Sequence, residues 1–351
     1  MEGGPGELRW RLAEHEESGR LFPESSLGER HVGTGEFRGM EFLHVNARTI
    51  VNKVPASSRM PFSYTINAYR GCSHACTYCF ARPTHTYLGL GIGEDFECKI
   101  VVKVNAVERL RAELRSPRWR GDSIAMGTNT DPYQKAEGKY HLTQGIVGVL
   151  AEAGNPFSIL TKSTLVLRDL ALLADATART RVRLALSIGT LERDVWQLTE
   201  PGAPPPDQRL EALRRLSEAG IRCGVLIAPV LPGLSDSDDQ LRAVAQACLE
   251  AGAVSVTPVA LHLRPGVREH YLGWLARTRP ELAELYAQRF RKGSYQPRAE
   301  QHHISEVVRA VQEAGGRDYP KHRPSGHEPT GRPREAPPQR VRPVNEQLRL
   351  L

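Results

Sequence analysis

The chain has 351 residues, of which 40% are apolar and 25% are charged, a balance typical of a globular protein with a substantial core. No run approaches the roughly 18 consecutive apolar residues that a membrane-spanning helix needs, and the first residues lack the basic and apolar regions of a secretory signal. Six cysteines are too few for a disulfide scaffold, so we expect a cytoplasmic protein whose cysteines act as ligands.

The two ends of the chain differ from its middle. Residues 1–40 are polar and rich in Gly and Glu, which predicts a flexible N-terminal arm. Residues 317–351 contain seven prolines and eight Lys or Arg against four Asp or Glu, so they hold +4 of the net charge of +7. Such a basic tail is typical of a disordered segment, although it also suits contacts with nucleic-acid phosphates. Residues 41–316 are expected to form the folded core with its extensions.

Short apolar runs alternate with amphipathic stretches along this core. The runs are rich in Ile, Leu and Val, which is typical of strands that are buried on both faces of a sheet. Helical stretches follow several of them, for example Leu210–Leu216 and Gln240–Glu250. The predicted strands are Ser63–Ala68, Ser123–Gly127, Phe157–Thr161, Val182–Ile188, Gly224–Val230 and Val254–Ala260.

Four glycines that end helical stretches mark a repeat. Gly154, Gly220, Gly252 and Gly315 are 66, 32 and 63 residues apart, close to one or two βα units of about 30 residues or slightly more. We therefore predict an α/β fold in which six parallel strands form a partial (β/α)6 TIM-like barrel, with a doubly wound sheet as the alternative. In either fold the active site lies at the carboxyl ends of the strands.

Three of the six cysteines follow the first predicted strand with the spacing Cys72-x3-Cys76-x2-Cys79. Three thiolates this close in sequence can share one iron–sulfur cluster whose fourth iron has no protein ligand. The alternative is a structural zinc site with Cys98 or a histidine as the fourth ligand. Zinc sites usually combine two Cys-x2-Cys pairs, and the sequence has no second pair, so the spacing favours the cluster.

This motif, after the first strand of a six-fold βα pattern, resembles that of the radical S-adenosylmethionine (SAM) superfamily, over roughly residues 63–261. The resemblance implies that Cys72, Cys76 and Cys79 hold a [4Fe–4S] cluster and that SAM chelates the fourth iron. An electron from the cluster would cleave SAM to methionine and a 5′-deoxyadenosyl radical, which abstracts hydrogen from a substrate. The resemblance also implies a low-potential electron donor of the ferredoxin or flavodoxin type.

The same resemblance implies contacts with SAM. Tyr78 stands where the family places an aromatic residue beside the adenine. The stretch Gly127–Gln134 lacks the Gly-Gly-Glu motif of many members and resembles instead the Ser/Thr-Asp motif of the spore photoproduct lyase branch. By that likeness Thr130 and Asp131 would meet the methionyl amino end of SAM, where a carboxylate suits an ammonium group.

Polar residues at two further strand ends complete the set. Lys162 would pair with the SAM carboxylate or reach the ribose, and Ser187 stands where the family uses a small polar residue for the same group. Glu200 and Arg209 flank the loop after the fourth strand and are expected to form a solvated surface pair. Three histidines are expected to be ordinary surface or loop residues, namely His262, His302 and His303.

The sequence departs from the lyase at the position of its hydrogen-donor cysteine, because Thr128 stands there. The thymine-dimer chemistry is therefore not expected, and the substrate stays open between nucleic acid, by likeness to the DNA-repair lyase, and a peptide or small molecule. A protein of another class, an iron–sulfur or zinc protein that binds a partner without turnover, would not need this set of polar strand-end residues.

Truncation at Gly316 tests the tail. If nucleic acid is the partner, removing eight basic residues should flatten the salt dependence of binding, by about 0.9 in log–log slope for each duplex phosphate that the tail neutralises. SAM cleavage should be spared, because every cluster and strand-end residue lies upstream. Filter binding of both proteins to DNA and RNA across a salt series measures the slopes, and equal slopes would show that the tail takes no part.

Overall fold

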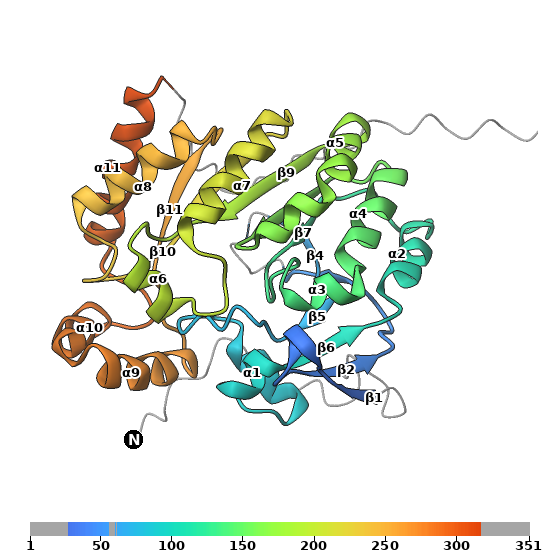
Figure 1. Ribbon diagram of the computed structural model, residues 1–351, viewed down its shortest axis with the longest axis horizontal. Helices are drawn as coiled ribbons and strands as arrows, with labels where there is room; N and C mark the ends of the chain where they lie inside the picture. The colour runs from blue at the N-terminus through green and yellow to red at the C-terminus, as the bar shows by residue number, and fades with distance from the viewer. Residues whose placement is uncertain (1–26, 56–59, 61, 317–351) are drawn as a thin grey trace, which may run out of the picture.

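The computed structural model describes residues 27–55, 60 and 62–316 (Figure 1). Its centre is a seven-stranded sheet with the order β11-β10-β9-β8-β7-β4-β3. Neighbouring strands from β4 to β11 are parallel, and β3 is antiparallel at one edge. The strands are β3 (Val51–Lys53), β4 (Tyr64–Ile66), β7 (Ile124–Met126), β8 (Phe157–Thr161), β9 (Val182–Ser187), β10 (Cys223–Val230) and β11 (Val256–Ala260).

The six predicted strands are confirmed, and each begins and ends within two residues of its predicted limits. Their order across the sheet follows their order in the sequence, as in a barrel. A doubly wound sheet would instead reverse the strand order at a switch point, so that alternative is wrong. Within the described ranges no strand joins β3 to β11, and the barrel is therefore partial and open.

Helices connect the strands and cover the outer face of the curved sheet (Figure 1). Their apolar sides complete the core, for example through Leu213 of α7 and Leu241 of α8, which are both fully buried. No helix in the described part of the chain is long and apolar enough to cross a membrane. The helices are α1 (Glu94–Cys98), α2 (Ala106–Leu114), α3 (Lys135–Tyr140), α4 (Leu142–Glu152), α5 (Leu170–Arg179), α6 (Arg193–Thr199), α7 (Pro206–Glu218), α8 (Asp238–Glu250), α9 (Val267–Thr278), α10 (Ala283–Arg289) and α11 (Arg298–Ala314).

A second, four-stranded sheet has the order β1-β2-β6-β5, with β1 at Leu27–Val32, β2 at Glu41–Val45, β5 at Tyr69–Arg70 and β6 at Lys99–Lys103. β1 is antiparallel to β2. The prediction of a flexible arm through residue 40 is therefore wrong for its described part, because the free edge of β2 offers main-chain hydrogen bonds that a polar segment can use. Residues 1–26 and the predicted tail, 317–351, lie outside the described residues.

The segment after β11 folds beside the cysteine-bearing loop. It forms α9, a short turn and α10, which lie together next to that loop (Figure 1). Leu263, Tyr271 and Phe290 of this extension pack in one buried cluster with Cys76 and Tyr78. The extension thus walls one side of the carboxyl ends of the strands.

Candidate active site

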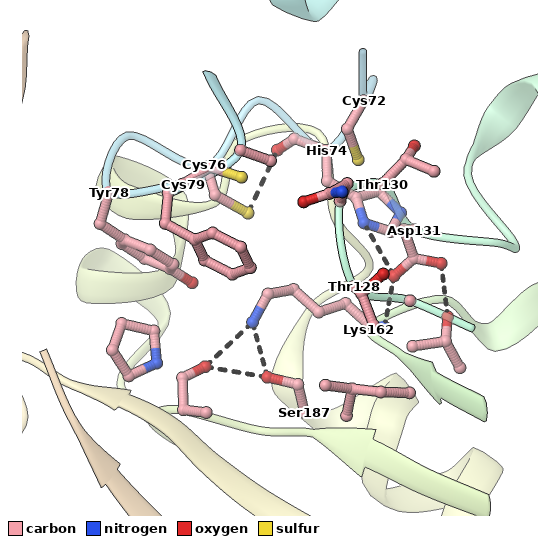
Figure 2. Close-up of a pocket in the computed structure, with 18 of the residues that line it drawn as sticks. Cys72, His74, Cys76, Tyr78, Cys79, Thr128, Thr130, Asp131, Lys162 and Ser187 are labelled. Carbon is pink, nitrogen blue, oxygen red and sulfur yellow. Dashed lines mark hydrogen bonds and ion pairs between the residues drawn. The ribbon is translucent and has the colours of Figure 1, made fainter. Parts of the chain in front are cut away.

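The three cysteines lie on the loop that follows β5. Gly71 begins this loop with a φ of +83°, and a Cβ at this position would come within 2.9 Å of Phe96 O, so only glycine fits. Cys72 and Cys76 are buried, Cys79 is half-buried, and all three thiols are free. Figure 2 shows the cysteine loop on one side of a cavity and the polar strand-end residues on the other.

Side chains from other segments hold the main chain of the cysteine loop. Gly71 O accepts hydrogen bonds from Thr130 Oγ1 at 2.6 Å and from Gln134 Nε2 at 2.9 Å. On the other side of the loop the fully buried Arg82 donates to Cys76 O at 2.9 Å. The sequence pattern indicated neither Gln134 nor Arg82 as part of the site. The position of Gln134, four residues after Thr130 and three after the motif aspartate, is the signal that could have found it.

Asp131 is buried and connects the ends of two strands. Its carboxylate accepts hydrogen bonds from Thr161 Oγ1 and from the main-chain N of Lys162, both at 2.7 Å, and lies 3.4 Å from His74 Nδ1. Burial alone would raise the pKa of Asp131, but His74 and the hydrogen bonds from Thr161 and Lys162 outweigh it and lower the pKa. Asp131 is therefore ionised at neutral pH.

Lys162 extends from the end of β8 toward the end of β9. Its Nζ lies 2.7 Å from Ser187 Oγ and 3.1 Å from Ala228 O. The same Nζ lies 2.9 Å from a carboxylate oxygen of Glu200 and 5.7 Å from the centre of the Tyr78 ring. Figure 2 shows the Lys162 side chain between Ser187 and the cysteine loop. An ammonium whose side chain is 13% exposed is thus held in place by polar partners on two sides.

Glu200 and Arg209, predicted to form a solvated surface pair, are both buried, so this prediction is wrong. The Glu200 carboxylate bonds the Arg209 guanidinium, the Tyr78 hydroxyl and the Lys162 ammonium. The chain after β9 turns back toward the cysteine loop, and a main-chain hydrogen bond joins the end of α6 to that loop. Burial would raise the pKa of Glu200, but the charges of Arg209 and Lys162 outweigh it and lower the pKa to about 2.

All eight residues singled out for the site line one cavity. Its empty space is about 890 Å³, a figure that includes the part open to solvent. The eight are Cys72, Cys76, Tyr78, Cys79, Thr130, Asp131, Lys162 and Ser187.

The cavity lining also includes residues that the sequence pattern did not indicate, among them His74, Phe80 and His262. His262 was expected to be an ordinary surface or loop residue, but it is partly buried against the cavity, so that expectation is wrong. It follows the end of β11, and its place at a strand end is the signal that could have found it. His302 and His303 are exposed on α11, as expected.

The cysteines suit a cluster better than a single ion. Among the described residues no three His, Cys, Asp or Glu side chains are grouped so that they could hold one metal ion, and Cys98 lies outside the cavity lining. In a [4Fe–4S] cluster each cysteine binds a different iron, so the sulfurs need not converge on one point. Burial raises the pKa of all three thiols, to about 12 for Cys76, so they become thiolates only beside a strong positive charge such as iron.

Comparison with known families identifies the class of protein. The sequence profile of the radical SAM superfamily matches residues 66–244, which include the three cysteines and the polar ends of β7, β8 and β9. The chain therefore belongs to the radical SAM superfamily and is an enzyme of that class. The family implies a [4Fe–4S] cluster, SAM and a source of electrons.

Individual relatives and a solved structure give more specific similarities than the superfamily does. An uncharacterized protein of Mycobacterium tuberculosis is 47% identical over 268 residues, covering 76% of this chain and 79% of the relative. The radical SAM Nalpha-GlyT isomerase of Pseudomonas phage M6 is 27% identical over 169 residues, covering 48% of this chain and 33% of that protein. Among solved structures, spore photoproduct lyase complexed with dinucleoside spore photoproduct has a TM-score of 0.57 at 18% identity, covering 78% of this chain and 79% of that one, which shows a common fold.

Glu200→Gln tests the buried charges. The substitution leaves the ammonium of Lys162 and the guanidinium of Arg209 without their counter-charge, so we expect the free energy of unfolding at pH 7 to fall by about 3–5 kcal/mol. Because folding lowers the pKa of Glu200 from 4.5 to about 2, its contribution is present above about pH 4.5 and is lost as the pH falls toward 2. Urea unfolding across this pH range measures both effects.

The control is Glu211→Gln, which removes an exposed ion pair with Arg214 and should cost about 1 kcal/mol or less. Equal losses of unfolding free energy in Glu200→Gln and Glu211→Gln would contradict a buried charge network around Glu200. A difference in unfolding free energy between Glu200→Gln and the wild type that does not shrink below pH 4.5 would also contradict it.

Proposed function

We propose that Cys72, Cys76 and Cys79 hold a [4Fe–4S] cluster at which this enzyme cleaves SAM, so that the 5′-deoxyadenosyl radical abstracts hydrogen from a substrate. The observation that supports it is one cavity with three free thiols on one wall and the polar strand ends on the other. When bound, the reduced cluster supplies the electron that breaks a carbon–sulfur bond of SAM. A ferredoxin or flavodoxin is the proposed source of that electron.

The residues opposite the cysteines are proposed to bind and orient SAM. The ionised Asp131 suits the methionyl ammonium, and the ammonium of Lys162 suits the carboxylate. Ser187 keeps Lys162 in position through its hydroxyl. The hydroxyl of Thr130 is bonded to Gly71 O, so Thr130 fixes the cysteine loop beside the amino end of SAM. Tyr78 is proposed to lie next to the adenine, with its own hydroxyl held by a buried carboxylate.

Nucleic acid is the proposed substrate class. Spore photoproduct lyase, whose fold is similar, has been solved with a dinucleoside spore photoproduct, and the Pseudomonas phage M6 relative is named an Nalpha-GlyT isomerase. The reaction is proposed to differ from that of the lyase, because Thr128 lines the cavity and, by the sequence resemblance, stands at the position of the lyase's hydrogen-donor cysteine. Among the described cavity residues the only thiols are those of Cys72, Cys76 and Cys79.

Anaerobic reconstitution tests the cluster and the reaction together. We expect about four irons per chain, because three cysteines leave one iron for SAM. After reduction with dithionite, SAM should be converted to 5′-deoxyadenosine, which chromatography detects. Cys76→Ala should lose most of the iron and all cleavage, whereas Cys98→Ala should retain both, since Cys98 lies outside the cavity lining. Zinc in the purified protein without deoxyadenosine would instead indicate a non-catalytic metal-binding protein.

Substitutions of the two charged residues test the SAM site without the reaction. Asp131→Asn and Lys162→Ala each remove one partner of a desolvated charge pair, which typically costs about 2–5 kcal/mol, or some 30-fold or more in SAM affinity. Calorimetric titration of the reconstituted, unreduced protein with SAM measures the affinity. Iron content should equal that of the wild type, because neither residue is a proposed ligand.

The control is Lys135→Ala, which removes an exposed lysine four residues after Asp131. It should bind SAM like the wild type. If Asp131→Asn and Lys162→Ala also bind SAM with unchanged affinity, the proposed SAM site is misplaced.

A further inference from the structure

Three aromatic side chains form a row from the cavity to the surface. The rings of Phe80 and His262, which both line the cavity, lie 5.8 Å apart between centres. On the outer side, the ring of Tyr295 stacks on His262 at 5.7 Å with an interplanar angle of 23°. Phe80 is 42% exposed and Tyr295 is 59% exposed, so both rings present a face to solvent. We call these three residues the aromatic platform.

The backbone holds the platform in a fixed arrangement. His262 and Tyr295 are paired in an isolated antiparallel bridge, and Leu263 N donates to Ser294 O at 2.8 Å. The buried Gln296 adds a side-chain hydrogen bond to Leu261 O at 3.3 Å. The segments before α9 and after α10 are therefore tied together, so the rings lose little conformational freedom when a ligand binds.

Three basic residues lie close in sequence to His262 and Tyr295. Arg264, two residues after His262, is exposed, and so are Arg291 and Lys292, which precede Tyr295. In the described part of the chain none of these three side chains forms an ion pair with an acidic residue. Burial, and secondly the charge of Arg264, lower the pKa of His262, so its ring is neutral at physiological pH. The platform thus combines neutral, stackable faces with exposed basic side chains, which suit an anion.

We propose that the aromatic platform binds an unpaired base of a nucleic-acid strand and that Arg264, Arg291 and Lys292 bind the adjoining phosphates. Aromatic faces beside a basic groove are the arrangement by which proteins bind single strands, since every base has a face that can stack. A base inside a duplex exposes no such face, so a duplex would have to extrude it. This inference rests on the proposed function for its substrate class, and it adds a site outside the proposed SAM-binding residues.

Fluorescence anisotropy of the full chain with a labelled 12-nucleotide strand tests the platform. We expect Tyr295→Ala to weaken binding of single-stranded DNA or RNA about tenfold or more, because one stacking face is removed. Tyr295→Phe keeps the ring and should bind like the wild type. Tyr87→Ala removes an equally exposed tyrosine (54%) outside the platform and is the matched control. The labelled DNA, RNA and matched duplex are compared, and the single strand should bind more tightly than the duplex.

The salt dependence of strand binding separates the contribution of the basic side chains from that of stacking. Arg291→Gln with Lys292→Gln should flatten the log–log salt slope by about 0.7 for each single-strand phosphate that these side chains neutralise. Tyr295→Ala should lower the affinity and leave the slope unchanged. The matched double variant is Arg183→Gln with Arg222→Gln, because both of these exposed residues lie near the amino ends of β9 and β10, at the edge of the sheet opposite the cavity.

Two outcomes overturn the proposal. One is equal affinity of the wild type, Tyr295→Ala and the Arg291/Lys292 variant for every strand. The other is the absence of any binding at low salt, which would point to a peptide or small molecule. SAM cleavage by the wild type is measured separately. Cleavage of SAM without strand binding refutes the platform and the proposed nucleic-acid substrate but spares the proposed SAM cleavage at the cluster. Platform-dependent strand binding without cleavage supports the platform and refutes the proposed cleavage.

Discussion

A loop that brings three cysteines into the interior also buries its own main-chain polar groups, and each of these needs a partner. This constraint explains much of the architecture around the cavity. Thr130 and Gln134 satisfy Gly71 O from the strand side, and the buried guanidinium of Arg82 satisfies Cys76 O from the other. The motif after β7 therefore has a structural role as well as a chemical one, because its hydroxyl and amide fix the loop before any ligand binds.

Charge balance is the second requirement of a buried polar cavity, since unpaired charges there are costly. Glu200 is offset by both Lys162 and Arg209, and Asp131 accepts hydrogen bonds from the Thr161 hydroxyl and the main-chain N of Lys162. Glu200 pairs with two cations, so it does not depend on Lys162 alone for its counter-charge. Because Arg209 keeps Glu200 ionised, the ammonium of Lys162 can turn toward an incoming carboxylate without leaving a lone buried anion behind.

The strands and the cysteines could be predicted because their signals are local. Strands buried on both faces need continuous apolar runs, such as Phe157–Thr161, and parallel strands bring their carboxyl ends to one edge whatever the loops do. The position of Glu200 could not be predicted, because it depends on the path of the chain after β9, which no periodicity encodes. β1 was missed for a related reason, since edge pairing uses main-chain groups that every sequence has.

The same packing connects the cysteine loop to the aromatic platform. Cys76 and Tyr78 share an apolar cluster with Leu263, and Leu263 is the residue next to His262 and the one bonded to Ser294. A shift of the cysteine loop would therefore disturb the aromatic platform. The shared packing thus keeps the distance between the cysteine loop and the platform constant. Radical chemistry needs a site from which water is excluded. Phe80 lines the cavity and is 42% exposed, so a base stacked on the platform would cover a part of the lining that solvent reaches.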